Sequence, residues 1–167
     1  CSSDLNNSPE VCTVLIEAGA EVNARDNGGK SPLMFAAGFN SNPEVCTLLI
    51  KAGAEVNARN KWSEESPLMF AAQYNQTPEV CEALIKAGAE VNAHDNDGKS
   101  PLIYAAQHNQ TPEVCTVLII AAAEIYQYGN GGKSSLIYAA RHHNLEVCTV
   151  LINVAAEDNS RAPDCYH

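Results

Sequence analysis

The sequence predicts an all-α repeat solenoid, built from helix-turn-helix units that are joined by β-turn fingers. Internal repetition at a period of 33 to 35 residues carries this prediction, because such periods are typical of stacked units that share one continuous core. Three blocks recur in a fixed order along the 167 residues. They are Glu-Val-Cys at Glu10, Glu44, Glu79, Glu113 and Glu146; Ser-Pro-Leu-Met-Phe-Ala-Ala or a close variant at Ser31, Ser66, Ser100 and Ser134; and Ala-Gly-Ala-Glu-Val-Asn-Ala at Ala18, Ala52 and Ala87, decayed at Ala121.

Each block predicts one element of the unit. Ser31 is a capping residue before Pro32, and proline fits the first position of a helix because its missing N–H costs nothing there. Residues 40–42 break this first helix, and Pro43 begins a second helix that is apolar over most of its circumference and must be covered on both sides. Gly53 lies where a left-handed C-terminal cap is expected, and turn residues such as those at 26–29 form the finger.

The chain is predicted to be one domain, residues 1–167, with a partial unit at 1–25, units at 26–59, 60–94, 95–128 and 129–162, and a tail at 163–167. The register places the start of the chain midway through a first helix and its end where another first helix would begin. Neither end has an obvious polar capping helix, which solenoids need for solubility. We therefore expect either a piece of a longer array or an array whose ends are covered.

Composition and charge narrow the class of protein. Hydrophobic residues make up 46% of the chain and charged residues 18%, which excludes a disordered protein. No run of 18 apolar residues is present, so no membrane-spanning helix and no membrane partner are expected. Twenty acidic against ten basic side chains give a net charge of −10, which disfavours nucleic acid as a partner.

Cysteine spacing points to free thiols. Stacked helices lie about 8–10 Å apart, whereas a disulfide needs Cα atoms within about 7 Å. Cysteines in one register of the second helix are therefore predicted to be free and buried, which favours the cytoplasm or another reducing compartment. They are Cys12, Cys46, Cys81, Cys115 and Cys148.

No enzyme is predicted, and neither a metal ion nor a cofactor is expected. The chain has no Cys-x-x-Cys, and its histidines do not adopt a metal-ligand spacing. The glycine-rich residues 129–132 follow no strand and lack the lysine pattern of a phosphate-binding loop. No paired carboxylates and no serine–histidine–acid set stand out from the repeats.

The repeated residues resemble the ankyrin repeat family over about residues 4 to 157. The first half of the family pattern is matched by Asp95, Gly98, Ser100, Pro101, Leu102, Ala105 and Ala106, and the second half by Val114, Leu118 and Ile119. One departure is that Met34, Met69, Ile103 and Ile137 replace the family histidine, which removes its usual hydrogen bond to the finger backbone. The resemblance also implies that Asn23, Asn57 and Asn92 help to hold the fingers. In some family members this asparagine is hydroxylated, but the structural role is the expectation for this chain.

The resemblance implies a binding surface on a concave face, formed by the fingertips and the outer ends of the first helices. Phe39, Trp62 and Tyr74 are large aromatic residues at positions expected to be exposed, and Trp62 lies in a finger with one extra residue. The alternative is that each packs on its neighbour's finger and only stabilises the solenoid. Phe35, Phe70, Tyr104 and Tyr138 recur in register and are expected to pack between units. The predicted binding residues are Asn27, Lys30, Phe39, Lys61, Trp62, Tyr74, Asn96, Asp97, Lys99, His108, Asn130, Lys133, Arg141 and His142.

Three functions compete at this stage. The leading hypothesis is a non-catalytic module that binds another protein on a rigid concave surface. The second is a structural protein that stacks head to tail into oligomers or filaments, through ends that expose residues such as Leu136 and Leu151. The third is an engineered or consensus-derived scaffold, suggested by the near-identity of the units.

Overall fold

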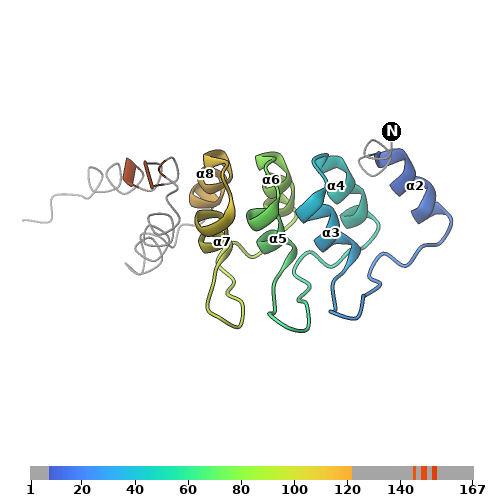
Figure 1. The fold of residues 1–167 in the computed structure, drawn as a ribbon. Coiled ribbons are helices and arrows are strands. Elements are labelled where there is room, and N and C mark those ends of the chain that lie inside the picture. The colour runs from blue at the N-terminus through green and yellow to red at the C-terminus, as the bar shows by residue number, and fades with distance from the viewer. Residues whose placement is uncertain (1–7, 122–144, 146–147, 150–151, 154–167) are drawn as a thin grey trace, which may run out of the picture.

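A computed structural model describes residues 8–121, together with 145, 148–149 and 152–153. Within these residues the chain is helical, with no strand, and pairs of helices follow one another in a row with long loops extending to one side (Figure 1). This confirms the all-α repeat fold. The helices between residues 8 and 121 are α2 (Pro9–Glu17), α3 (Pro32–Phe39), α4 (Pro43–Lys51), α5 (Pro67–Tyr74), α6 (Pro78–Lys86), α7 (Pro101–His108) and α8 (Pro112–Ala121).

Each of these helices begins at a proline, and the first helix of each unit also has a serine cap. The Ser31 hydroxyl accepts a hydrogen bond from the Met34 backbone N–H at 3.3 Å, and Ser66 does the same for Met69. The cap satisfies an N–H that has no partner inside the helix. The predicted starts of the helices are therefore correct.

Methionine at the position of the family histidine accepts a weak hydrogen bond at the helix cap. The Ser31 N–H donates to the Met34 sulfur at 3.5 Å, and the Ser66 N–H donates to the Met69 sulfur at 3.4 Å. A thioether is a weak acceptor, so this bond is weaker than one to nitrogen or oxygen. This bond lies at the cap of the first helix, so it does not test the expected loss of the histidine's hydrogen bond to the finger backbone, which stays a prediction.

Gly53 ends α4 as the sequence predicts. Its φ is 100°, in the region that favours glycine, and the Ala54 N–H turns back to the Leu49 carbonyl at 2.9 Å. The chain then leaves the helix layer toward the next finger.

The core lies between the two helices of each unit and continues from one unit to the next. Among the described residues, α5 packs between α3 and α7, while α6 packs between α4 and α8. Leu68, Leu84 and Leu118 are fully buried there, and alanines such as Ala72 let neighbouring first helices approach closely. The fold thus holds the first helices and the fingers in a fixed order.

The cysteines are free, but the prediction that all five are buried is wrong for two of them. Cys46, Cys81 and Cys115 are completely buried, and burial raises the pKa of each thiol to about 12. Cys12 and Cys148 are half-buried. Cys12 lies on α2, which packs against α4 and has no helix on its other side among the described residues.

Phe35 also departs from its predicted role. Phe70 and Tyr104 are buried between units as expected, whereas Phe35 is 45% exposed. Among the described residues no first helix precedes α3, so one side of the Phe35 ring is uncovered. Tyr138 lies outside the described residues.

A buried asparagine at the end of α5, and another at the end of α7, joins its first helix to the preceding unit. The Asn75 side-chain amide donates to the carbonyls of Ala37 and Asn40, each at 2.8 Å, while its oxygen accepts from the Thr77 N–H at 2.9 Å. Asn109 makes the same three bonds one unit later. The sequence pattern at residues 40–42 predicts only a helix break and does not reveal this contact.

Candidate protein-binding surface

The fingers bond to one another along the array. The Lys61 N–H donates to the Gly28 carbonyl at 2.9 Å, and the Asn96 N–H donates to the Ser63 carbonyl at 3.0 Å. The Asn96 side chain also donates to the Trp62 carbonyl at 3.2 Å. These bonds fix the spacing of the fingertips, so residues on successive fingers keep their relative positions.

Arginine and asparagine side chains hold the bases of the fingers. One nitrogen of Arg25 donates to the carbonyls of Gly29 and Arg59, at 3.0 and 3.2 Å, and its other nitrogen pairs with Glu55 at 2.9 Å. Asn23 joins the backbones of Gly53 and Glu55 of the next unit by two bonds of 2.9 Å.

The same contacts recur one unit later. Arg59 bonds to the carbonyls of Glu64 and His94, and Asn57 bonds to the backbones of Gly88 and Glu90. The expected structural role of Asn23 and Asn57 is therefore present. Their hydroxylation stays untested.

The extra residue in the finger at 60–65 is accompanied by an unfavourable backbone conformation at Glu64. Glu64 has a φ of 58°, in the left-handed region, where Gly29 and Gly98 stand in the neighbouring fingers. This finger exposes Trp62, whose side chain is 77% accessible. One edge of the indole lies against Gly28, where an added Cβ would come within 3.4 Å of the Trp62 Nε1. Trp62 thus contacts its neighbour's finger and still presents most of its surface to solvent.

Aromatic rings form a continuous group at the outer ends of α3 and α5. Phe39 and Tyr74 stack with their centroids 5.1 Å apart, and Phe35 lies 6.4 Å from Phe39. Phe39 is 63% exposed and Tyr74 is 46% exposed. The neighbouring unit can approach this closely because Gly38 faces Phe70 and Tyr74, and a Cβ at Gly38 would meet both rings at 3.5–3.6 Å.

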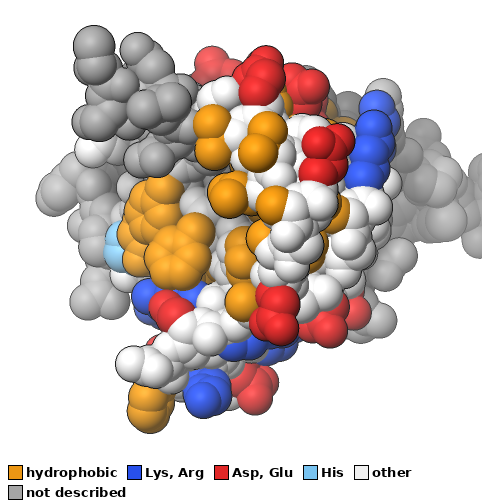
Figure 2. Space-filling model, turned by 90° about the vertical axis from the view of Figure 1, so that its right-hand side faces the viewer, with side chains coloured by type: hydrophobic (Ala, Val, Ile, Leu, Met, Phe, Trp, Pro, Cys, Tyr) orange, Lys and Arg blue, Asp and Glu red, His pale blue; other side chains and the backbone are white. Residues whose placement is uncertain are grey.

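Two lysines lie over aromatic rings beside this group. The Lys30 ammonium is 6.0 Å from the centroid of Phe35 and 5.8 Å from that of Phe70, and the Lys99 ammonium is 5.6 Å from that of Tyr104. Figure 2, which faces the α2 end of the array, shows hydrophobic side chains at the left with Lys and Arg side chains directly beneath them. We call the surface that carries Lys30, Phe35, Phe39, Trp62, Tyr74, Lys99 and His108 the inner face.

The remaining predicted binding residues are placed as follows. Asn27, Lys61 and Asp97 are exposed on fingers, and Asn96 is exposed while its amide is engaged in the finger-to-finger bond. His108 is exposed and stacks on Tyr104 at 6.2 Å. Four predicted residues, and the end residues Leu136 and Leu151, lie outside the described residues; the four are Asn130, Lys133, Arg141 and His142.

The inner face also perturbs two phenols. Burial, and then the nearby Glu65 carboxylate, raise the pKa of the Tyr74 side chain. Burial is also the first cause of a raised pKa at Tyr104, followed by its hydroxyl's 2.5 Å hydrogen bond to Asp95. Both phenols are therefore neutral at physiological pH; Tyr74 is exposed, whereas Tyr104 is buried and its hydroxyl already donates to Asp95.

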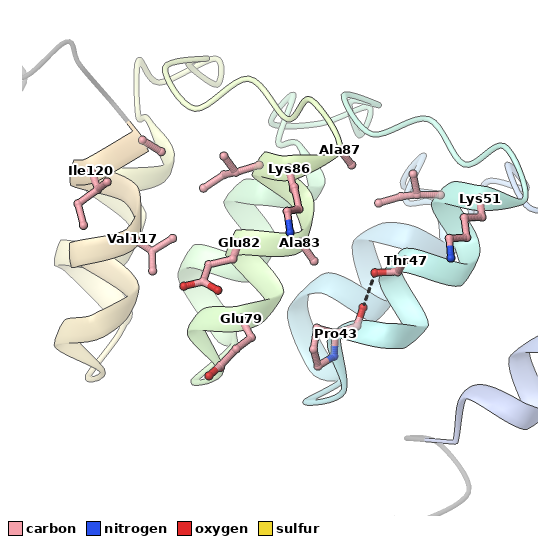
Figure 3. Close-up of a pocket in the computed structure, with 13 residues that line it drawn as sticks. Pro43, Thr47, Lys51, Glu79, Glu82, Ala83, Lys86, Ala87, Val117 and Ile120 are labelled. Carbon is pink, nitrogen blue, oxygen red and sulfur yellow. Dashed lines mark hydrogen bonds between the residues drawn. The ribbon is translucent and has the colours of Figure 1, made fainter.

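A hollow lies on the outer side of α4, α6 and α8, and it was not predicted from the sequence. This outer groove has a volume of about 930 Å³. Figure 3 shows Lys51 and Lys86 toward one end of its helices and Pro43 and Glu79 toward the other. An isoleucine that recurs three residues before Gly-Ala, as at Ile50 and Ile85, was the available signal. The residues that line the outer groove are Pro43, Thr47, Ile50, Lys51, Glu79, Glu82, Ala83, Ile85, Lys86, Ala87, Val117, Ile120 and Ala121.

Searches of the described residues for two other kinds of site gave nothing. No group of three or more histidine, cysteine, aspartate or glutamate side chains there could hold a metal ion. No described helix is long and apolar enough to cross a membrane.

Comparison with known families gives the chain's relationship. A family model described as ankyrin repeats (3 copies) matches residues 2–60, 40–128 and 68–162, which together span nearly the whole chain. The chain belongs to the ankyrin repeat family. A search of curated proteins gave no match to it.

Ankyrin repeats generally mediate protein–protein interaction and are typically non-catalytic. Membership of this family therefore favours an exposed surface, rather than a set of reactive side chains, as the functional site. In this ankyrin chain two surfaces compete for that role, namely the inner face and the outer groove.

Proposed function

We propose that this chain is a non-catalytic module that binds another protein through its inner face. The observation that carries the proposal is the group of large aromatic side chains left exposed there, with Trp62 at 77%, Phe39 at 63% and Tyr74 at 46%. Tryptophan and tyrosine are enriched among the residues that contribute most to binding energy, and contiguous apolar patches commonly mark interaction sites.

Rigidity supports the same choice of surface. Phe39 and Tyr74 stack on each other, and the finger that carries Trp62 is bonded to the fingers on both sides. Side chains that are already ordered lose less conformational entropy when a partner binds. The inner face is therefore prepared for binding in a way that isolated surface residues are not.

The test begins with partner segments selected from a displayed library of natural protein fragments. Affinities for the selected segments are measured by fluorescence polarisation for the wild type and for Trp62→Ala, Phe39→Ala and Tyr74→Ala. We expect Trp62→Ala to cost about 2 kcal/mol, or roughly 30-fold in affinity. Val14→Ala removes an exposed aliphatic side chain on α2 and serves as the control.

Each variant is checked for an unchanged thermal unfolding midpoint. If the selected segments bind all three aromatic variants as tightly as the wild type, the inner face is not the binding surface. Loss of affinity in Ile85→Ser alone would assign binding to the outer groove.

Head-to-tail association is a second candidate, favoured by the apolar side of α2. Val11, Val14 and Leu15 are between 41% and 63% exposed there, and Figure 2 looks onto this end. Two unlike ends that meet produce a heterologous contact, which builds filaments when it does not close. Sedimentation of the wild type and Val14→Glu over a range of concentrations tests it: a wild type that stays monomeric removes this candidate.

A further inference from the structure

Lys30 and Lys99 differ from the other described lysines in how they are held. Both are half-buried and lie over aromatic rings, whereas Lys51, Lys61 and Lys86 are exposed. Both occupy the same register, immediately before the capping serine of a first helix. Lys30 thus lies beside Phe35 of the aromatic group, and Lys99 lies two units further along, over Tyr104.

Neither ammonium is paired with a carboxylate of the described residues, although acidic side chains outnumber basic ones two to one in the chain. The ion pairs of the described part of the chain are formed by Arg25 and Arg59 at the finger bases. A ring face attracts a cation but accepts at most one of its three N–H donors. Lys30 and Lys99 therefore keep donors for a partner.

The residue in the same register between them cannot supply that partner. Glu65 precedes Ser66, and its Oε2 accepts from the Asn60 amide at 3.0 Å and from the Ser63 hydroxyl at 2.5 Å. Its carboxylate is held by its own finger. The inner face thus presents two held cations, Lys30 beside the half-exposed Phe35 and Lys99 over the buried Tyr104, with the Glu65 carboxylate engaged by its own finger between them.

We propose that the partner segment, bound as in the proposed function on which this inference rests, is acidic and apolar together. A large apolar side chain lies on Phe39 and Tyr74, and carboxylates accept hydrogen bonds from Lys30 and Lys99. Hydrogen bonds between ionised groups are about twice as strong as neutral ones, and cations already fixed in place lose less entropy on binding.

The spacing of the units sets how far apart the two carboxylates of the partner segment lie. Lys30 and Lys99 belong to units two steps apart, which is about 16–20 Å for helices packed about 8–10 Å apart. An extended segment covers that distance in about five or six residues. Two carboxylates at that spacing can reach both lysines from one segment.

The net charge of −10 does not contradict an acidic partner. At physiological ionic strength the screening length is about 8 Å, so remote acidic side chains are largely screened and charges in direct contact decide the preference. A basic segment, attracted by the overall charge, is the competing result.

The probe is a displayed library of random 12-residue peptides, selected against the wild type in 0.15 M salt. We expect the selected peptides to be enriched in Asp and Glu and to contain a Phe, Tyr, Trp or Leu. Lys30→Met and Lys99→Met keep an apolar stem and remove the charge. Each is expected to weaken the binding of the selected peptides by about tenfold, the value of one charge-assisted hydrogen bond.

Lys51→Met and Lys86→Met are the matched controls, because they remove the same charge in the outer groove, and they are expected to leave affinity unchanged. Basic peptides, or acidic peptides that bind Lys30→Met and Lys99→Met as tightly as the wild type, overturn the acidic specificity. The proposed function survives that result if Phe39→Ala and Tyr74→Ala still weaken binding. Peptides insensitive to the aromatic and the lysine variants alike overturn both, and a library that yields no binder overturns the inference, which requires only a short segment.

Discussion

The inner face and the outer groove differ in what fixes their side chains. On the inner face, ring contacts cross from one unit to the next, as between Phe39 and Tyr74, and the buried Asn75, which follows Tyr74 in the chain, bonds to Ala37 of the preceding unit. In the outer groove, the Thr47 hydroxyl bonds within its own helix, to the Pro43 carbonyl at 3.2 Å. The bond stays within one helix, while Ile50, Ile85 and Val117 of the groove lining pack against the continuous core. The proposed choice of the inner face therefore rests on order across units rather than on the volume of a hollow.

The largest effect is expected at alkaline pH, where deprotonation puts a negative charge on the buried thiols of α4, α6 and α8. The folded state raises the pKa of Cys46, Cys81 and Cys115 to about 12, while an unfolded thiol titrates near about 8.5. A raised pKa means that this stability is complete below about pH 8.5 and is lost as the pH rises toward 12. We expect the free energy of unfolding, measured with urea under reducing conditions, to fall by several kcal/mol between pH 9 and 12.

Single variants separate these thiols from general alkaline damage. Cys81→Ala should reduce the slope of stability against pH by up to about 1.4 kcal/mol per pH unit, the value of one proton. Cys12→Ala, at a half-buried thiol, should change the slope less. Identical slopes in the wild type and Cys81→Ala would show that the buried thiols do not set the alkaline limit.

The next effect tests whether order across units is what stabilises the inner face. Asn75→Ala leaves the carbonyls of Ala37 and Asn40 and the Thr77 N–H without their buried partner. Unsatisfied buried groups cost about 1–3 kcal/mol each, partly relieved by relaxation, so we expect a loss of about 3 kcal/mol in chemical denaturation. Thr47→Ala, in the outer groove, should change stability by less than about 0.5 kcal/mol. Equal losses in the two variants would remove the distinction between the surfaces.

Local residues made most of the fold predictable. The serine–proline pairs and Gly53 act on their own turns of backbone, so their effect could be inferred without knowing the neighbours. The exposure of Trp62 and Phe39 followed from their place in the repeat. The family pattern then supplied the face on which they lie.

Contacts between units were harder to predict. Asn75 acts on carbonyls 35 and 38 residues away, and its own segment shows only a helix break. Its recurrence in register with Asn40 and Asn109 was a usable signal, because a polar residue that repeats with the core is expected to be hydrogen-bonded. The exposure of Phe35 depends on a neighbouring helix, and the outer groove depends on the distance between helices, which the sequence does not state.

A smaller effect measures the aromatic stack itself. A double-mutant cycle with Phe39→Ala and Tyr74→Ala should give a coupling of about 1 kcal/mol in unfolding free energy, typical of stacked rings. The comparison pair is Ile50→Ala and Val117→Ala. Both residues line the outer groove, and α6 lies between their helices, α4 and α8. This pair should be additive within about 0.5 kcal/mol. A coupling as large in the outer pair would mean that the outer groove is ordered across units as well.

The smallest effect concerns the finger that carries Trp62. Glu64 has a φ of 58°, and the left-handed conformation costs a residue with a Cβ about 1–2 kcal/mol, whereas glycine adopts it freely but loses about 0.5–1 kcal/mol more in chain entropy. Glu64→Gly should therefore stabilise the fold by about 0.5 kcal/mol in urea denaturation. Its bond to Arg59 uses the backbone carbonyl and is retained. The reverse change in the next finger, Gly98→Ala at a φ of 76°, should destabilise the fold. If Glu64→Gly instead lowers stability, the finger is not strained, and the exposure of Trp62 on the inner face does not come at a backbone cost.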